Sequence, residues 1–130
     1  MKVVVVDDSS IVRERVTEML RELLLVEEIT HAIGGLAALD VIAHVLPDLV
    51  VLDIHMPNPD GEIGINGIDV LKRIKSIHNP PCVIMLSNFS EPQYRTRCRQ
   101  LGADAFLDKS IEFFQLASIA KELLNKRYIA

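Results

Sequence analysis

The chain has 130 residues, of which 49% are hydrophobic and 25% charged, and its formal net charge is -4. This length suits one domain that buries about two-thirds of its unfolded surface, and the apolar content excludes a disordered chain. The negative charge argues against direct binding of nucleic acid, which normally requires a basic face. No apolar run approaches the roughly 20 residues that span a bilayer, and no secretory signal is visible. We therefore expect a cytoplasmic protein without membrane insertion.

Short apolar runs alternate with helical periods along the whole chain, which is typical of alternating strands and helices. In chain order we expect a strand at Lys2–Val6, a helix at Ser9–Leu25, a strand at Glu28–Ile33, a helix at Leu36–Val45, a strand at Leu49–Leu52, a helix from Gly67 to Ile77, a strand at Val83–Leu86, a helix from Ser90 to Leu101, a strand at Ala105–Leu107 and a helix at Ile111–Asn125. Such units give a parallel sheet with helices on both faces, because each crossover is right-handed. The simplest α/β arrangement is a flavodoxin-like, doubly wound, five-stranded parallel sheet of order 2-1-3-4-5.

Charged residues end three of the apolar runs. Asp7 and Asp8 follow the first strand, Asp53 follows the third, and Lys109 follows the fifth. In such a sheet the functional crevice lies outside the carboxyl ends of the strands, and this order makes strands one and three neighbours. Two carboxylates about 4 Å apart repel by about 4 kcal/mol at an effective dielectric of about 20, so three together raise a pKa or bind a cation. Mg²⁺ suits these ligands and keeps waters that a phosphate can displace.

Taken singly, these residues also have ordinary structural interpretations. Asp7 and Asp8 could favour the N-terminus of the next helix, and Asp53 could begin a turn. Lys109 can supply positive charge to a phosphate, although a lysine after a strand is more often a solvated surface residue. Ser87 ends the fourth strand, where its hydroxyl could bind a phosphoryl oxygen or serve a cap or turn.

The combination of these residues is more specific than any one of them. Val6-Asp7-Asp8-Ser9, the stretch Asp53-Ile54-His55-Met56-Pro57, Ser87 and Lys109 together resemble the receiver domain of two-component response regulators. The resemblance covers essentially the whole chain. It implies a single, stand-alone receiver domain over residues 1–130 with the flavodoxin-like fold.

The resemblance implies a role for each residue at the crevice. Asp53 is the implied phosphoacceptor, which takes a phosphoryl group from a sensor histidine kinase or a phosphotransfer protein. Asp8, the Asp53 carboxylate and the backbone carbonyl of His55 are the implied Mg²⁺ ligands, with Asp7 acting through a bound water. Lys109 is implied to pair with the new phosphate. The chain would then catalyse only its own phosphorylation and dephosphorylation, and would not be a metabolic enzyme.

Two more residues are implied to form the switch. Ser87 would move toward the phosphate and Phe106 would change rotamer, which alters the surface of the fourth and fifth strand–helix units for an unknown protein target. From the residues alone, Phe106 is an ordinary core aromatic. Because no residues remain for an output domain, we expect the chain to dock to a partner or relay the phosphate. A phosphorylation-dependent homodimer is left open.

The chain departs from the family pattern beside the site. The loop after the third strand is long. The customary glycine could be Gly61 by its spacing from Asp53 or Gly67 by its position before Ile68. We favour Gly67 as the start of the next helix and interpret Asn58–Asn66 as an insertion. Ser110 follows Lys109 where receivers usually have proline. We expect the Lys109–Ser110 peptide bond to be cis nonetheless, at a cost of about 2.5–4 kcal/mol.

Other polar residues near these elements carry weaker expectations. Asn88 is larger than the usual family residue and is expected to crowd the phosphate or to bind it. Arg95, Arg97 and Arg99 do not share one helical face, so we interpret them as a solvated surface.

Three other functions compete with the phosphorylation switch. The strongest is a receiver-like docking module that works without phosphorylation. A Mg²⁺-dependent aspartyl phosphohydrolase is weaker, because His55 stands where such enzymes commonly carry a second aspartate. A flavin carrier is also weak, since Asp7 and Asp8 would repel the flavin phosphate after the first strand.

Overall fold

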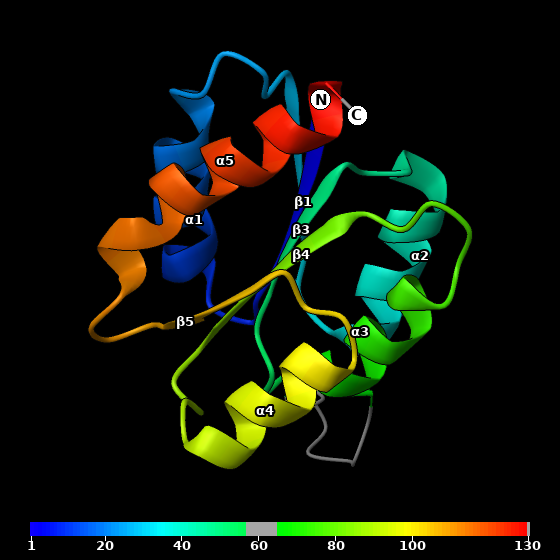
Figure 1. Ribbon diagram of the computed structural model, residues 1–130, viewed down its shortest axis with the longest axis vertical. Helices are drawn as coiled ribbons and strands as arrows, with labels where there is room; N and C mark the ends of the chain where they lie inside the picture. The colour runs from blue at the N-terminus through cyan, green and yellow to red at the C-terminus, as the bar shows by residue number, and fades with distance from the viewer. Residues whose placement is uncertain (57–64, 130) are drawn as a thin grey trace.

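The computed structural model describes residues 1–56 and 65–129. Figure 1 shows the arrangement of the elements in space. In chain order they are β1 (Lys2–Val6), α1 (Ser10–Arg21), β2 (Glu28–Ala32), α2 (Gly35–Val45), β3 (Leu49–Leu52), α3 (Gly67–Lys75), β4 (Cys82–Ser87), α4 (Pro92–Gln100), β5 (Ala105–Asp108), the 3₁₀-helix η1 (Phe113–Gln115) and α5 (Leu116–Ile129). Among the described residues, no helix is both long and apolar enough to cross a bilayer.

The described strands form one five-stranded parallel sheet in the order β2-β1-β3-β4-β5. Helices α1 and α5 cover one face, and α2, α3 and α4 cover the other (Figure 1). The predicted flavodoxin-like, doubly wound fold is therefore confirmed. In this order the carboxyl ends of β1 and β3 are adjacent, and β5 lies two strands away from β3.

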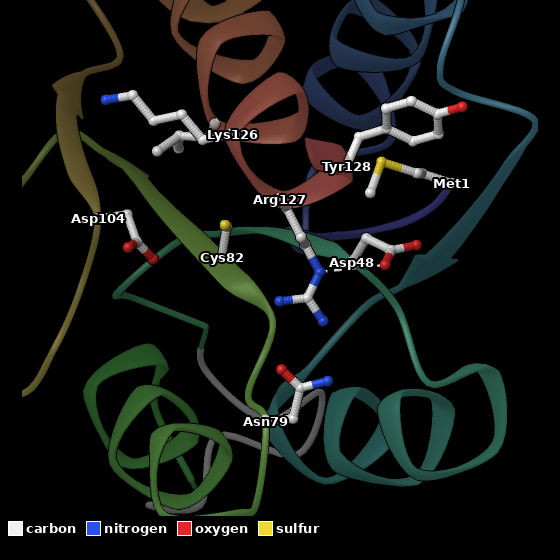
Figure 2. Close-up of a pocket in the computed structure, with 9 residues that line it drawn as sticks. Met1, Asp48, Asn79, Cys82, Asp104, Lys126, Arg127 and Tyr128 are labelled. Atoms are coloured by element: carbon white, nitrogen blue, oxygen red, sulfur yellow. Dashed lines mark hydrogen bonds and ion pairs between the residues drawn. The ribbon is translucent and has the colours of Figure 1, made fainter. Parts of the chain in front are cut away.

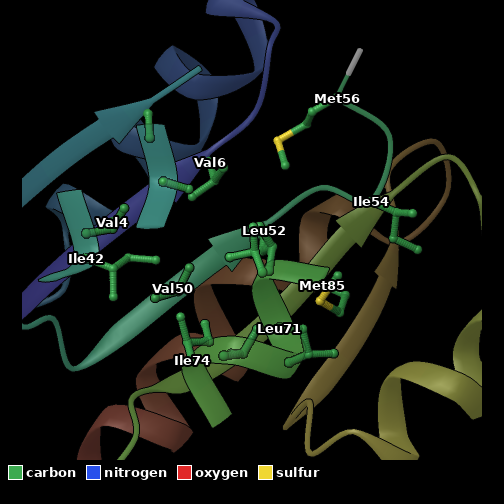
Figure 3. Packing of buried hydrophobic residues seen from close by; sticks show 14 of the residues in the cluster. Val4, Val6, Ile42, Val50, Leu52, Ile54, Met56, Leu71, Ile74 and Met85 are labelled. Atoms are coloured by element: carbon green, nitrogen blue, oxygen red, sulfur yellow. The ribbon is translucent and has the colours of Figure 1, made fainter. Parts of the chain in front are cut away.

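The central strands are buried on both faces, which explains their continuous apolar sequence. Val4, Val50 and Met85 point into the core beneath α2 and α3, as Figure 3 shows. Their chain neighbours, such as Val51 and Ile84, point into the second core beneath α1 and α5. Alternation of side chains along a strand thus fills two cores from one run of residues.

The predicted boundaries of the first and last helices are wrong. Helix α1 ends at Arg21 rather than Leu25, because the chain leaves the helix in short turns in which Leu23 N–H donates to Leu20 O and Val26 N–H to Leu23 O. The last helix, predicted at Ile111–Asn125, begins only at Leu116, after the 3₁₀-helix, and continues to Ile129. Leu23 and Leu25 in the first segment and Phe113 in the second still pack on the core beneath α1 and α5, although the backbone there is not α-helical.

Helix α3 begins where the sequence predicted. Asn66 caps it by accepting a hydrogen bond from Asp69 N–H at 3.0 Å, while the Asp69 carboxylate accepts from Asn66 N–H at 3.1 Å. Gly67 is the first helical residue, which confirms its interpretation as the helix start. Most of the expected Asn58–Asn66 insertion lies outside the described residues.

Asp48 connects several segments at the amino ends of the strands, on the side of the sheet opposite the candidate site. Its carboxylate accepts hydrogen bonds from Lys2 N–H at 2.9 Å and from Arg127 Nε at 3.1 Å, and its backbone bonds to Lys2 O and Cys82 N–H. Figure 2 shows the Asp48–Arg127 contact beside a surface hollow near the half-buried Cys82. Burial opposes ionisation of Asp48, but the bonds from Lys2 and Arg127 outweigh it and hold its pKa below the ordinary value.

We predict that Asp48→Ala lowers the free energy of unfolding by about 1–3 kcal/mol, the usual cost of losing charge-assisted hydrogen bonds at a partly buried site. Urea denaturation measures this loss, with Asp40→Ala on the exposed surface of α2 as the control. Because the folded-state pKa is lowered, the Asp48 contribution is complete above pH ~4 and is lost as the pH falls through that pKa. If the difference in unfolding free energy between the wild type and Asp48→Ala does not become smaller below pH ~4, this account is wrong.

Candidate functional site

The end of β1 places two carboxylates in different surroundings. Asp7 is only 2% exposed, and its Oδ1 accepts a hydrogen bond from Ser9 N–H at 2.8 Å, while Asp8 is exposed. Ser9 then caps α1 through a bond from Val12 N–H at 3.3 Å. Asp7 therefore binds the backbone just before α1, in line with its structural interpretation from the sequence, and it also faces the crevice.

Asp53 follows β3 and is likewise buried, at 6% exposure. Its backbone N–H donates to Val6 O, which fixes it beside the end of β1. Its Oδ1 accepts a hydrogen bond from Ile54 N–H at 2.8 Å, and its Oδ2 lies 3.1 Å from the amine of Lys109. Oδ2 is the oxygen turned toward the crevice cation.

Lys109 joins the two buried carboxylates. Its Nζ lies 2.8 Å from Asp7 Oδ2 and 3.1 Å from Asp53 Oδ2, and its backbone N–H donates to Ser87 O. Ligand oxygens of Asp7, Asp8 and Asp53 all lie within 4.8 Å of one another. The structure thus brings together the three carboxylates and the lysine that the sequence singled out.

The pKa values of Asp7 and Lys109 are shifted because these charged groups are buried close together. Burial raises the pKa of Asp7, and the charge of Asp53 adds to this, against the lowering effect of the bonds from Lys109 and Ser9. Burial alone would lower the pKa of Lys109, but its bond to Asp7 and the charges of Asp53 and Asp7 raise it. Lys109 is therefore held as the ammonium ion, which compensates the buried negative charge.

A cavity of about 300 Å³ opens over these groups. Its wall includes the three aspartates and Lys109, together with His55, Asn88 and Phe89. Its volume and its mixed charge suit a small anion held together with a cation.

The comparison with known families follows from this geometry. A sequence model described as the response regulator receiver domain matches residues 3–121. The chain belongs to this family. The receiver domain is thus shown for most of the chain, as the sequence motifs predicted.

Similar proteins include two curated methylesterases. The chain is 33% identical over its full length to the protein-glutamate methylesterase/protein-glutamine glutaminase of Clostridium acetobutylicum and spans 36% of that protein. It is 34% identical over its full length to the protein of the same name from Bacillus subtilis and spans 35% of it. The chain therefore covers about a third of the length of these relatives.

Solved receiver structures share the fold. The response regulator domain of Thermotoga maritima CheB matches with a TM-score of 0.75 and 29% identity, covering 97% of this chain and 92% of that one. The signal receiver domain of a DNA binding response regulator from Colwellia psychrerythraea matches with a TM-score of 0.82 and 25% identity, covering 96% and 98%.

The expected cis bond at Lys109–Ser110 is wrong, since the described residues contain no cis peptide bond. A trans bond avoids the cost of about 2.5–4 kcal/mol. The turn that proline would shape in other receivers is held instead by the Asp108 carboxylate, whose Oδ1 accepts from Ser110 N–H at 2.7 Å and from Ile111 N–H at 3.3 Å. The Ser110 hydroxyl also donates to Asn88 Oδ1 at 3.2 Å.

Neither of the two expected switch residues, Ser87 and Phe106, is among the described residues that line the cavity. Ser87 is fully buried, and its Oγ accepts a hydrogen bond from Phe89 N–H at 3.1 Å, so the hydroxyl oxygen faces its own loop. Phe106 is half-buried beneath the guanidinium of Arg95. Their roles in this receiver remain predictions.

The sequence analysis missed two residues, one on the wall of the cavity and one bonded to the backbone of Asp7. Phe89 lies on the cavity wall, and the centre of its ring lies 5.3 Å from the ring centre of His55 and 5.7 Å from that of Tyr94. An aromatic residue two positions after Ser87 was the available signal. Arg13 donates from Nη1 to Asp7 O at 2.7 Å, a contact that its position on α1 alone did not indicate.

The interpretation of Arg95 as part of a solvated surface is wrong. Its side chain is half-buried and bonds to Ser90, Phe106 and Glu112, whereas Arg97 and Arg99 are exposed. Of these three arginines, Arg95 turns inward toward β5.

Gly67 is required by the close approach of α3 to the phosphoacceptor candidate. A Cβ at this position would lie 1.8 Å from the backbone oxygen of Asp53, and Gly67 N–H donates to Ile54 O at 2.8 Å. The absence of a side chain lets the helix start fix the segment that carries Asp53.

We predict that Gly67→Ala lowers the free energy of unfolding by at least about 2 kcal/mol, because overpacking against backbone cannot be relieved by a rotamer change. Gly34→Ala is the matched control, since a Cβ there meets no atom within 4 Å. Chemical denaturation compares the two variants. Equal losses in both would show that general glycine effects, and not contact with Asp53, determine the cost.

Proposed function

We propose that the chain is a phosphorylation-activated signalling switch of a two-component phosphorelay, acting as one receiver domain over residues 1–130 in the cytoplasm. The observation that carries the proposal is the Lys109 amine bound to both Asp7 and Asp53 beneath a cavity of about 300 Å³. This arrangement provides a buried nucleophile, a fixed cation and room for one phosphoryl group. Family membership supports the same assignment.

Asp53 is the proposed phosphoacceptor. Its Oδ1 is engaged by Ile54 N–H, which leaves Oδ2 as the attacking oxygen beside Lys109. A bond forms from Oδ2 to phosphorus while the bond from phosphorus to the donor breaks, giving an acyl phosphate. The donor is a phosphohistidine of a sensor histidine kinase or a phosphotransfer protein.

Lys109 acts as the charge partner throughout this reaction. Before transfer its ammonium group compensates Asp7 and Asp53. After transfer the Asp53 carboxylate no longer carries its own charge, so the ammonium can pair with oxygens of the bound phosphoryl group. Such fixed positive charge stabilises the transition state because it needs no reorganisation during the reaction.

The carboxylates fit a magnesium ion by their chemistry. Asp7, Asp8 and Asp53 offer hard oxygen donors within 4.8 Å of one another, the ligand type that Mg²⁺ prefers. We assign Asp8, Asp53 and the His55 backbone carbonyl as ligands, with Asp7 acting through water. When bound, the ion neutralises charge on the phosphoryl oxygens.

Phosphorylation is proposed to change the surface formed by the fourth and fifth strand–helix units, β4–α4 and β5–α5. Ser87 would turn from its own loop toward the phosphoryl group, and Phe106 would change rotamer. These movements would couple the charge added at Asp53 to a change at a protein surface. A downstream protein would bind that surface, and a second copy of the chain is the alternative partner. The methylesterase and glutaminase activities named for the relatives belong to longer proteins, and the proposal does not extend to them.

We predict that acetyl phosphate with Mg²⁺ adds one phosphoryl group to the chain, because the site itself catalyses the transfer. Intact-mass spectrometry measures the adduct. Asp53→Asn and a metal-free sample are the controls, and neither should be modified. If no adduct forms and beryllium fluoride with Mg²⁺ also fails to bind, the docking module that works without phosphorylation becomes the better account.

We predict that Asp8→Asn weakens Mg²⁺ binding by about tenfold or more without lowering the free energy of unfolding, since Asp8 is exposed and its charge lies near two other carboxylates. Isothermal titration calorimetry with Mg²⁺ gives the affinity, and urea denaturation gives the stability. Asp40→Asn on α2 should change neither quantity. An unchanged affinity in Asp8→Asn would remove this residue from the metal site.

A further inference from the structure

Arg95 on α4 connects three segments that lie apart in the sequence. Its Nε donates to Ser90 O at 3.0 Å, its Nη1 to Phe106 O at 3.2 Å and its Nη2 to Glu112 Oε1 at 2.5 Å. Its guanidinium carbon also lies 4.9 Å from the centre of the Phe106 ring, within cation–π range. One side chain thus bonds to the β4–α4 loop, to β5 and to the residue before η1.

The partners of Arg95 are bonded to one another. Glu112 Oε1 also accepts a hydrogen bond from Asp108 N–H at 2.9 Å, and the Asp108 carboxylate accepts one from the Ser90 hydroxyl. The bond from Arg95, followed by that from Asp108 N–H, holds the pKa of Glu112 below its ordinary value. The segment carrying Lys109 is therefore part of a closed polar network centred on Arg95.

This network restrains the loop that would have to move on phosphorylation. The Ser87 hydroxyl oxygen accepts a hydrogen bond from Phe89 N–H in the loop that follows β4, and movement of this oxygen toward a phosphoryl group would break that bond. Ser90 lies in the same loop and is bound by both Arg95 and Asp108. Movement of residues 87–90 toward the cavity therefore disturbs the contacts of Arg95.

We propose that Arg95 is a positioning residue that latches the β4–α4 loop and Phe106 in the unphosphorylated arrangement, and so sets how readily the cavity accepts a phosphoryl group. The inference rests on the proposed function and goes beyond it. A contact that exists in only one of two states favours that state by its own free energy. Binding of a phosphoryl group is weakened by the same amount, and loss of the latch should strengthen it.

The neighbouring helix residue Arg97 provides a matched control. It lies two positions from Arg95 on α4 and is exposed, and its side chain has no hydrogen bond or ion pair among residues 1–56 and 65–129. Arg97→Met removes the same charge from the same helix without touching the network. General effects of charge on anion binding would appear equally in both variants.

The test measures the dissociation constant of beryllium fluoride, which mimics a phosphoryl group on a carboxylate, by calorimetry in the presence of Mg²⁺. We expect Arg95→Met to bind about five- to tenfold more tightly than the wild type, the scale of a partly exposed charge-assisted contact. Arg97→Met should match the wild type or bind slightly more tightly through loss of its charge alone. Arg95→Lys keeps the charge without the planar fork and should fall between Arg95→Met and the wild type.

Stability distinguishes a latch from a merely structural role. A latch stabilises only the free state, so Arg95→Met should lower the melting temperature of the free protein and leave that of the beryllium fluoride complex nearly unchanged. A structural role would lower both. Glu112→Gln should also tighten binding, and the double variant should bind no more tightly than Arg95→Met, because the two residues form one contact.

Two outcomes overturn different statements. If the wild type binds beryllium fluoride and Arg95→Met binds with the same or lower affinity, the latch is wrong and the proposed switch remains. If neither protein binds the probe with Mg²⁺, the phosphorylation switch itself is wrong, and the latch is wrong with it.

Discussion

The bond of one ammonium group to two buried carboxylates is the interaction on which the site depends. Asp7 and Asp53 end neighbouring strands, and both are almost completely shielded from water. Without Lys109 their mutual repulsion and loss of hydration would favour protonation or separation of the strand ends. The parallel sheet can therefore bring acidic groups together only because β5 carries a cation to the same edge. This contact offsets the negative charge that the two strands bring to one buried place.

Backbone contacts hold that charge cluster in place. Gly67 allows the start of α3 to bond directly to the peptide chain beside Asp53. On the other side, Asp108 shapes the turn after Lys109 by accepting bonds from Ser110 and Ile111. A carboxylate acting on backbone amides thus replaces the proline usual in the family, with a trans peptide bond. Asp108 also belongs to the Arg95 network, so this residue both positions Lys109 and restrains the β4–α4 loop.

The strands, their order and the charged residues at their ends could be predicted because apolar runs buried on both faces give a strong sequence signal. The end of α1 could not, since Leu23 and Leu25 keep an apolar period while the backbone already turns. The peptide bond after Lys109 was predicted wrongly because the cis geometry came from the family resemblance alone, whereas the neighbouring Asp108 carboxylate holds this turn with a trans bond. The inward turn of Arg95 was predicted wrongly because it depends on tertiary partners, and Glu112 lies 17 residues from Arg95. Local pattern carries no information about such contacts.

The row of rings beside the cavity has an optical consequence. The chain contains no tryptophan and two tyrosines, so Tyr94 and Tyr128 dominate its near-ultraviolet absorption and emission. Tyr94 packs against Phe89, which lines the cavity at the carboxyl edge of the sheet. Tyr128 lies at the far edge, near Met1 and Asp48 (Figure 2). The two tyrosines therefore lie at opposite ends of the molecule, and in a variant that lacks Tyr128 the remaining emission comes from the tyrosine beside the cavity wall.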